Sequence, residues 1–150
     1  MRKYIFKSSA AALFLTVLVF AAQNGSSARR AINPPSLEKS ANFSQGIQVG
    51  NTLYISGMQG TDKSGKLLNG IGAQTRGALA DISAVLQAAG YSMNDLVQVN
   101  VFLSDINDFA AMNKVYVSVL PAPRPTRTTV QAGALVNGAK IEISAVAMKH

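Results

Sequence analysis

The most constraining feature of this chain is the switch of its hydrophobic periodicity between strand spacing and helix spacing. Two short apolar-rich runs flank Gly50-Asn51, a dipeptide typical of a β-hairpin turn, and in the second run Leu53 and Ile55 alternate with polar residues. The spacing then becomes that of one helical stripe. Gly90 follows the stripe at the position of a helix C-terminal glycine. The stripe consists of Ile71, Thr75, Ala78, Ile82, Val85 and Ala89.

The second half of the chain repeats this alternation of periods. Apolar side chains at every second position predict a strand with one core face, formed by Val97, Val99, Val101 and Leu103. A second helix follows, with Asp105 or Asn107 as its cap, and "PAPRP" then breaks the chain. Two strands, 127–132 and 140–148, complete the order ββαβαββ. This order predicts one α+β domain, in which two helices cover one face of a mixed sheet.

The composition narrows the chemistry that the domain can perform. With 48% hydrophobic and 14% charged residues, the chain is too apolar to be disordered. It has no Cys, and its one His is the last residue, His150. We therefore expect no thiol nucleophile, no disulfide, no histidine-based triad and no metal site.

The net charge of +7 at first suggests a nucleic-acid or membrane partner. Five of the basic residues, however, lie within the first 30 positions. From Ala31 onward nine basic residues face seven acidic ones, so the predicted domain is nearly neutral. We expect no nucleic-acid partner, because a basic stripe is missing.

The N-terminus has the organisation of a secretory signal. Three basic residues precede a 13-residue, mostly apolar run, too short for the roughly 20 residues of a membrane span. Small residues favour cleavage after Ala21 or Ala28, and an uncleaved anchor is the alternative. We predict a signal peptide over 1–28, export to a periplasm without a stable membrane anchor, an extended lead-in over 29–41 and the domain over 42–150.

Two charged residues stand out in the last strands. Arg127 opens one strand and Glu142 interrupts the apolar run of the next, where a buried charge is costly unless it is paired. Alternation places a row of polar, mostly uncharged side chains on the same sheet face as these two. A face of this kind suits a subunit interface better than open water. The row is Thr52, Tyr54, Ser56, Gln98, Asn100, Thr129, Gln131 and Ser144.

The motifs "PTRTTV" and "KIEISAVA", with "GNTLYISG" and "QVNVFLSDINDFAAMNKVY", resemble those of the RidA (YjgF/YER057c/UK114) family from about Asn42 to Met148. The resemblance implies a chorismate-mutase-like fold, assembled as a homotrimer with sites at the subunit clefts. It also implies hydrolysis of reactive enamines and imines, such as 2-aminoacrylate and 2-iminobutanoate, to 2-keto acids and ammonia. The resemblance further implies that no metal or organic cofactor takes part.

Carried over by motif, the resemblance assigns roles to single residues. Arg127 would bind the substrate carboxylate, because a guanidinium offers a planar fork for it. Glu142 would orient or activate the attacking water. Asn113 would add a polar contact, and groups around Gly57 and Thr129 would complete the pocket.

Two positions depart from the family pattern and make the predicted pocket more apolar. Phe43 stands where some active members carry Tyr, so it would contact substrate without a hydroxyl, and Met58 stands where members often carry Gln. Three functions follow as hypotheses: an exported deaminase of 2-imino acids, a non-catalytic trimeric module that binds a small carboxylate or acts as a chaperone, and an RNA-directed role. For Arg127 and Glu142 the structural alternative is a cross-strand ion pair.

Overall fold

The computed structural model describes residues 28–149. The predicted signal peptide therefore lies outside the described residues, except for Ala28. Within the described part of the chain, no helix combines the length and the apolar character that a membrane crossing requires.

The elements follow the predicted order from Gly46 onward, with one additional short strand before it. This strand falls in the segment expected to be an extended lead-in, where it pairs with the first strand of the hairpin. The elements are β1 (Arg30–Ile32), β2 (Gly46–Val49), β3 (Thr52–Met58), α1 (Ile71–Ala88), β4 (Leu96–Leu103), α2 (Phe109–Val119), β5 (Thr126–Gln131) and β6 (Ile141–Met148), with 3₁₀ turns at Met93–Asp95, Ile106–Asp108 and Val136–Gly138.

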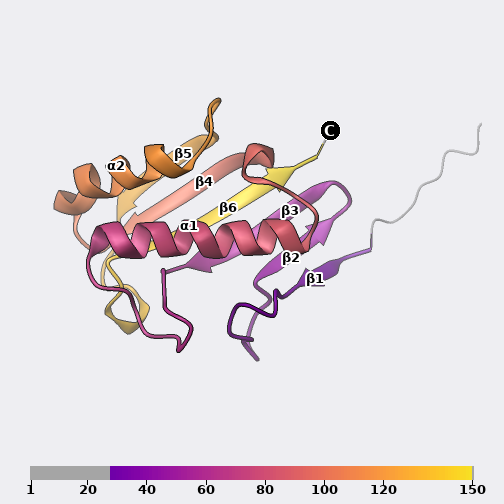
Figure 1. Ribbon diagram of the computed structural model, residues 1–150, viewed down its shortest axis with the longest axis horizontal. Coiled ribbons are helices and arrows are strands. Elements are labelled where there is room, and N and C mark those ends of the chain that lie inside the picture. The colour runs from indigo at the N-terminus through magenta and orange to yellow at the C-terminus, as the bar shows by residue number, and fades with distance from the viewer. Residues whose placement is uncertain (1–27, 150) are drawn as a thin grey trace, which may run out of the picture.

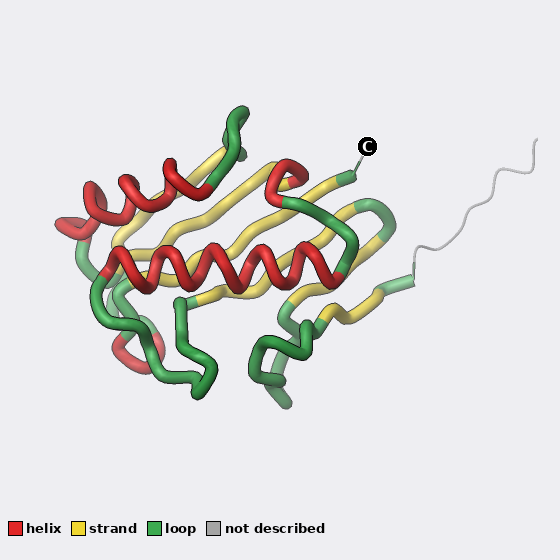
Figure 2. Tube along the Cα trace, viewed as in Figure 1, coloured by secondary structure: helices red, strands yellow, loops and turns green. Residues whose placement is uncertain are grey.

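One mixed sheet carries both helices on the same face, as predicted (Figure 1). The strand order is β1-β2-β3-β6-β4-β5, and all neighbours are antiparallel except β4 and β5. A parallel pair needs a crossover connection, and α2 supplies it between β4 and β5. Figure 2 shows that the loop between β1 and β2 and the loop between β3 and α1 lie at the same edge of the molecule.

The core lies between the sheet and the two helices. The predicted stripe of α1 faces it, since Thr75, Ala78, Ile82 and Val85 are fully buried. Gly90, at φ 80°, ends α1 in the left-handed conformation that glycine tolerates best. Of the two candidate caps of the second helix, Asp105 caps the 3₁₀ turn Ile106–Asp108 that leads into α2, accepting a hydrogen bond from the backbone N–H of Asn107 at 2.9 Å, while Asp108 at the start of α2 makes no side-chain cap bond.

Two irregularities in strand pairing shape the sheet. In β4 the register shifts between Leu96 and Gln98 against β6, so Val97 is displaced outward and is 38% exposed. The prediction that Val97 faces the core is therefore wrong, because a bulge adds one residue and Leu96 takes the inward place. In β3 a second shift lies between Ile55 and Met58, next to Gly57.

The predicted polar face is only partly correct. Asn100 pairs with Ser144 and Gln98 with Val146, so these side chains lie on the face without helices, which we call the open face. In β5, however, Arg127 pairs with the buried Val99, and Thr129 with the buried Val101. Paired residues share a face, so Arg127, Thr129 and Gln131 lie on the helix side of the sheet.

Candidate functional site

The first cluster gathers around Arg127 on the helix side of β5. Its Nη1 donates a hydrogen bond to Oδ1 of Asn113 on α2 at 2.9 Å. The guanidinium lies 4.5 Å from the ring centroid of Tyr116 and 5.6 Å from that of Phe109. We call these four residues the arginine cluster. Aromatic faces stabilise a cation without neutralising it, so the guanidinium keeps its charge.

No carboxylate neutralises Arg127 within residues 28–149, where the ion pair observed is Lys140–Asp108 at 3.0 Å. The cross-strand ion pair between Arg127 and Glu142 is thus wrong as an interpretation. Strand β4 lies between β5 and β6, and the two side chains leave opposite faces of the sheet. A half-buried guanidinium without an anion is suited to bind one from outside.

Two buried hydroxyls accompany the arginine cluster. The Tyr116 hydroxyl and Thr129 Oγ1 are both shielded from solvent and have no hydrogen-bond partner. Burial raises the pKa of Tyr116, while Arg127 and Arg124 act against this rise. The Tyr116 hydroxyl therefore stays protonated near neutral pH, and the ring serves as an apolar support for Arg127.

The second cluster surrounds Glu142 on the open face of β6. Gln59 donates a hydrogen bond from Nε2 to Oε2 of Glu142 at 2.8 Å. The carboxylate lies directly over Gly57, where any Cβ would collide with it. Glycine at this position is therefore required by the carboxylate, and Gln59 sets the carboxylate's orientation.

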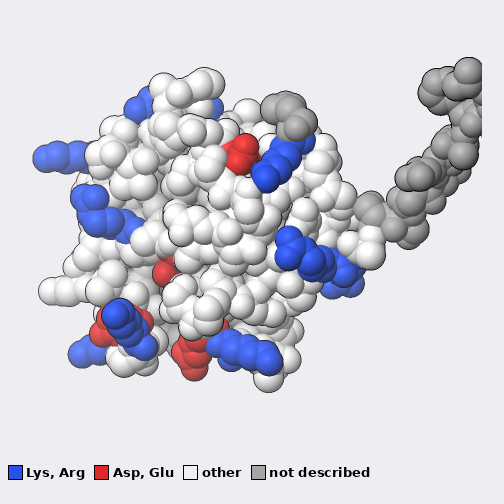
Figure 3. Space-filling view, turned by 45° about the vertical axis from the view of Figure 1, so that its right-hand side comes forward, with Lys and Arg blue, Asp and Glu red and all other residues white. Residues whose placement is uncertain are grey.

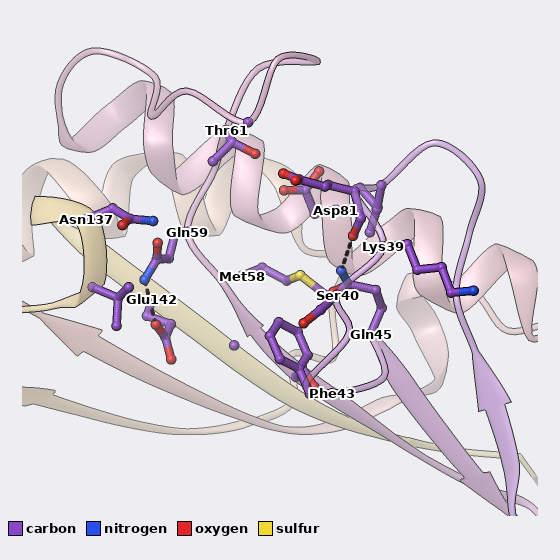
Figure 4. Close-up of a pocket in the computed structure, with 16 residues that line it drawn as sticks. Lys39, Ser40, Phe43, Gln45, Met58, Gln59, Thr61, Asp81, Asn137 and Glu142 are labelled. Carbon is purple, nitrogen blue, oxygen red and sulfur yellow. Dashed lines mark hydrogen bonds between the residues drawn. The ribbon is translucent and has the colours of Figure 1, made fainter.

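A groove of about 590 Å³ extends from Glu142 along the end of β3. It forms because β2 pairs with β3 only as far as Ile55, so the last residues of β3 face a loop instead of a strand. Gln45 holds that loop, donating from Nε2 to the carbonyl of Glu38 at 2.8 Å. Figure 4 shows Glu142 and Gln59 on one side of this groove, Asp81 on the other, and Met58 between them.

The predicted site residues thus separate into two sets within one subunit. Phe43, Gly57 and Glu142 line the groove. Arg127 and Asn113 meet in the arginine cluster on the other side of the sheet, with Thr129 in the same strand. The departure position Met58 also lines the groove, beside the 54% exposed ring of Phe43.

Sequence reasoning missed three polar residues of the groove. Gln59 follows Met58 directly, and nothing in a single sequence marks it as the partner of Glu142. Asp81 stands next to Ile82 of the helical stripe, and a carboxylate at the flank of a core stripe was a usable signal. Asn137 lies in a 3₁₀ turn with φ 58°, and only the loop's path brings it to the groove.

A six-stranded mixed sheet with two helices on one face, in this strand order, defines an α+β protein of the YjgF/RidA fold. The family model described as Endoribonuclease L-PSP matches residues 34–149. The chain therefore belongs to this family, which includes the RidA and YjgF proteins.

Individual relatives agree with this assignment. The chain is 38% identical over 109 residues to the 2-iminobutanoate/2-iminopropanoate deaminase of Mus musculus, which covers 71% of this chain and 81% of that protein. It is 41% identical over 127 residues to protein mmf1, mitochondrial, of Schizosaccharomyces pombe, covering 82% and 78%. The crystal structure of RidA from the Antarctic bacterium Psychrobacter sp. superposes with a TM-score of 0.77 at 38% identity, covering 80% of this chain and 99% of that one.

Proposed function

We propose that this protein hydrolyses small 2-imino acids, and the enamines that tautomerise to them, to 2-keto acids and ammonia. One observation carries the proposal. The chain presents a guanidinium without a carboxylate partner and a carboxylate held by a single amide over a glycine, and these are the two groups that the reaction needs. The deaminases among its relatives support the same chemistry.

In this mechanism Arg127 binds the substrate carboxylate through its planar fork, and Asn113 keeps the guanidinium in place. Glu142 accepts a proton from a water molecule as the water oxygen attacks the imine carbon. The imine nitrogen takes up a proton, and the resulting carbinolamine loses ammonia to leave the keto group. Each turnover consumes one imine and one water, and no covalent nucleophile is required.

The two groups act together only when subunits associate. Within one subunit they lie on opposite faces of the sheet, so we propose that Arg127 of one subunit meets the Glu142 groove of the next. The open face supports such an association, because it exposes Tyr54, Val130 and Met148 (52%, 42% and 37%) without any cover from the described residues. Apolar side chains gathered on one face are typical of an interface, and a closed ring of three subunits would repeat the site three times.

We also propose that residues 1–28 direct export, with cleavage after Ala21 or Ala28. This part of the proposal rests on the basic and apolar pattern of the N-terminus alone. N-terminal sequencing of the mature protein, together with cell fractionation, tests it. An intact N-terminus in the cytosolic fraction would contradict export.

The catalytic proposal is tested by the decay of 2-iminobutanoate, generated by an amino-acid oxidase and followed by trapping the remaining imine with semicarbazide. We expect the protein to speed the decay, and both Arg127→Ala and Glu142→Gln to abolish the effect. Arg124→Ala is the matched control, because Arg124 lies near the arginine cluster but hydrogen-bonds only the backbone carbonyl of Val117 within the described residues.

Each outcome decides between two functions. Acceleration that survives in both site variants would place the chemistry elsewhere in the protein. No acceleration by the wild type would favour a module that only binds small carboxylates, and 2-oxobutanoate would then be titrated against the wild type and Arg127→Ala to measure that binding.

A further inference from the structure

Asp81 is a carboxylate of the groove that the proposed reaction does not use. It projects from α1 and lines the groove that also holds Glu142 (Figure 4). Within residues 28–149, no hydrogen bond or ion pair reaches its carboxylate, since Lys140–Asp108 is the ion pair observed. The sheet edge where β2 has ended explains how one groove reaches both the open face and α1.

The environment of Asp81 disfavours its charge. Partial burial raises its pKa from 3.8 to about 6, and no hydrogen bond acts against the rise. At neutral pH the group is therefore mostly an ionised carboxylate without a partner. An external cation would stabilise the ionised carboxylate, because a charge-assisted hydrogen bond would replace the hydration that burial removes.

The other charged residues of the groove do not satisfy Asp81. Lys39 is the only Lys or Arg that lines the groove, and in Figure 4 its side chain extends away from Asp81. Lys63 lines a smaller pocket that also borders Asp81, but within residues 28–149 no ion pair joins the two residues. Glu38 lies against Gly65, where a Cβ would come within 2.9 Å of its carboxylate. With Glu38, Asp81 and Glu142 against Lys39, the groove is acidic within a domain that is nearly neutral. Basic side chains on the face shown in Figure 3 are scattered instead of gathered.

The size and walls of the groove fit a longer substrate. A volume of about 590 Å³ falls within the roughly 300–1,000 Å³ range of sites for drug-sized ligands, and a four-carbon imino acid would fill little of it. Met58 lies between Glu142 and Asp81, and Phe43 adds a second apolar side chain to the lining of the same groove. An aliphatic stem would pack along this lining with a cationic group at its end.

We propose that Asp81 forms a subsite for the cationic end of the substrate, so that the preferred substrates are 2-imino acids whose side chain carries a guanidinium or ammonium group. This inference rests on the proposed function, because it places the imine carbon at Glu142. It makes Asp81 a residue that determines specificity, while the proton transfer stays with Glu142.

The test compares two imino acids of nearly equal shape, formed by an amino-acid oxidase from L-arginine and from L-citrulline, whose side chains end in a charged guanidinium and a neutral urea. For the wild type we expect kcat/KM to be about tenfold higher for the guanidinium substrate, as a charge-assisted hydrogen bond provides. Asp81→Asn, which keeps the shape, should bring this ratio close to one.

Asp95→Asn is the control variant. It removes the same charge, but Asp95 lines no part of the groove or of the smaller pocket beside Asp81, and its carboxylate accepts hydrogen bonds from the backbone N–H and the hydroxyl of Ser92. The substrate ratio should be unchanged in this variant. An equal loss of preference in both variants would overturn the subsite in favour of a diffuse electrostatic effect, and so would a wild-type ratio near one while 2-iminobutanoate is hydrolysed.

Binding is measured separately, so that failure of the proposed function can be recognised. The carbon-13 resonance of the Asp81 carboxyl is titrated with pH in the presence of n-butylguanidinium or of n-butylurea. We expect only the guanidinium to lower the pKa of Asp81. This response without turnover of any imine would disprove the deaminase and keep the cation subsite, whereas no response to either compound would overturn the subsite.

Discussion

Arg127 and Glu142 leave opposite faces of the same sheet, with strand β4 between their strands. Each side chain is positioned by its own neighbours. Asn113 and two aromatic rings hold Arg127, while Gln59 and the space left by the missing side chain at Gly57 hold Glu142. Because these two positioned side chains cannot meet within one chain, we predict that a second chain completes the site. The first prediction therefore concerns the association of subunits.

The first prediction is complementation between inactive variants. Arg127→Ala and Glu142→Gln, refolded together in equal amounts, should recover about a quarter of wild-type activity, because one site in four would combine two intact groups in a randomly mixed ring. The same variants mixed without refolding should stay inactive if subunits exchange slowly. Imine decay and the mass of the assembly are measured together. Full inactivity of properly assembled mixed rings would show that both groups must come from one chain.

Gly57→Ala should reduce kcat strongly, because the added Cβ would overlap the Glu142 carboxylate and force it from its hydrogen bond with Gln59. Gly72→Ala is the matched control, since a Cβ there would meet only Val115 Cγ2 at 3.7 Å, an ordinary contact. This control should be stabilised by about 0.5–1 kcal/mol, as alanine is favoured in a helix. Steady-state kinetics and urea unfolding of both variants test the pair. Equal kcat values in the two variants would contradict the assigned position of Glu142.

Tyr116→Phe should keep or increase stability, by about 1 kcal/mol at most, because the buried hydroxyl has no partner to lose. The ring remains beside Arg127, so KM for a 2-imino acid should change little. Asn113→Ala is the contrast, since it removes the hydrogen bond to Arg127 and should raise KM several-fold. A large loss of stability in Tyr116→Phe would show that its hydroxyl is bonded after all, for example to an ordered water.

Asp81→Asn should stabilise the protein at neutral pH and not in acid. A carboxyl group whose pKa is higher in the folded protein than in the unfolded chain makes the protein less stable as pH rises between the two values, here from 3.8 to about 6. Asparagine does not ionise, so it avoids this loss of stability. After a discount for the partial exposure of the side chain, the free energy of unfolding of Asp81→Asn should exceed that of the wild type by about 1 kcal/mol at pH 7, and the difference should vanish near pH 4. Urea unfolding at both pH values, at one protein concentration, measures it.

Asp62→Asn provides the opposite pH dependence for comparison. Hydrogen bonds from Ser64 and Lys66 lower the pKa of Asp62, so its contribution to stability is present above its unfolded pKa and is lost as pH falls through the folded one. The variant should therefore be less stable than wild type at pH 7 and equal to it in strong acid. Parallel pH dependence in the two variants would contradict the assigned environment of Asp81.

Most of the fold could be predicted because the spacing of apolar residues in the sequence reflects which side chains are buried in the core. The stripe of α1, the alternation of Leu53 with Ile55 and that of Val99 with Val101 all meet the core as expected. Val97 could not be placed, since a bulge changes the register without any mark in an apolar run.

The candidate site shows where sequence reasoning reached its limit. The residue types at Arg127, Glu142, Gly57 and Asn113 were visible in the motifs, but β5 reads Thr-Arg-Thr-Thr-Val-Gln and has no apolar alternation to set its faces. The parallel register of β5 with β4 places Arg127 beneath α2, where it meets Asn113, a residue 14 positions away in the sequence.

By itself the sequence determined the order of elements, the core stripes and the charged residues available for chemistry. Residue type is read directly, and burial follows from the spacing of apolar residues within each short segment. Only the tertiary structure decided that Arg127 and Glu142 lie on opposite faces, that Gln59 holds Glu142, and that Asp81 shares its groove. Such relationships depend on which strands become neighbours and where their pairing ends. Strand neighbours are chosen by the whole packed domain, and no local pattern encodes them.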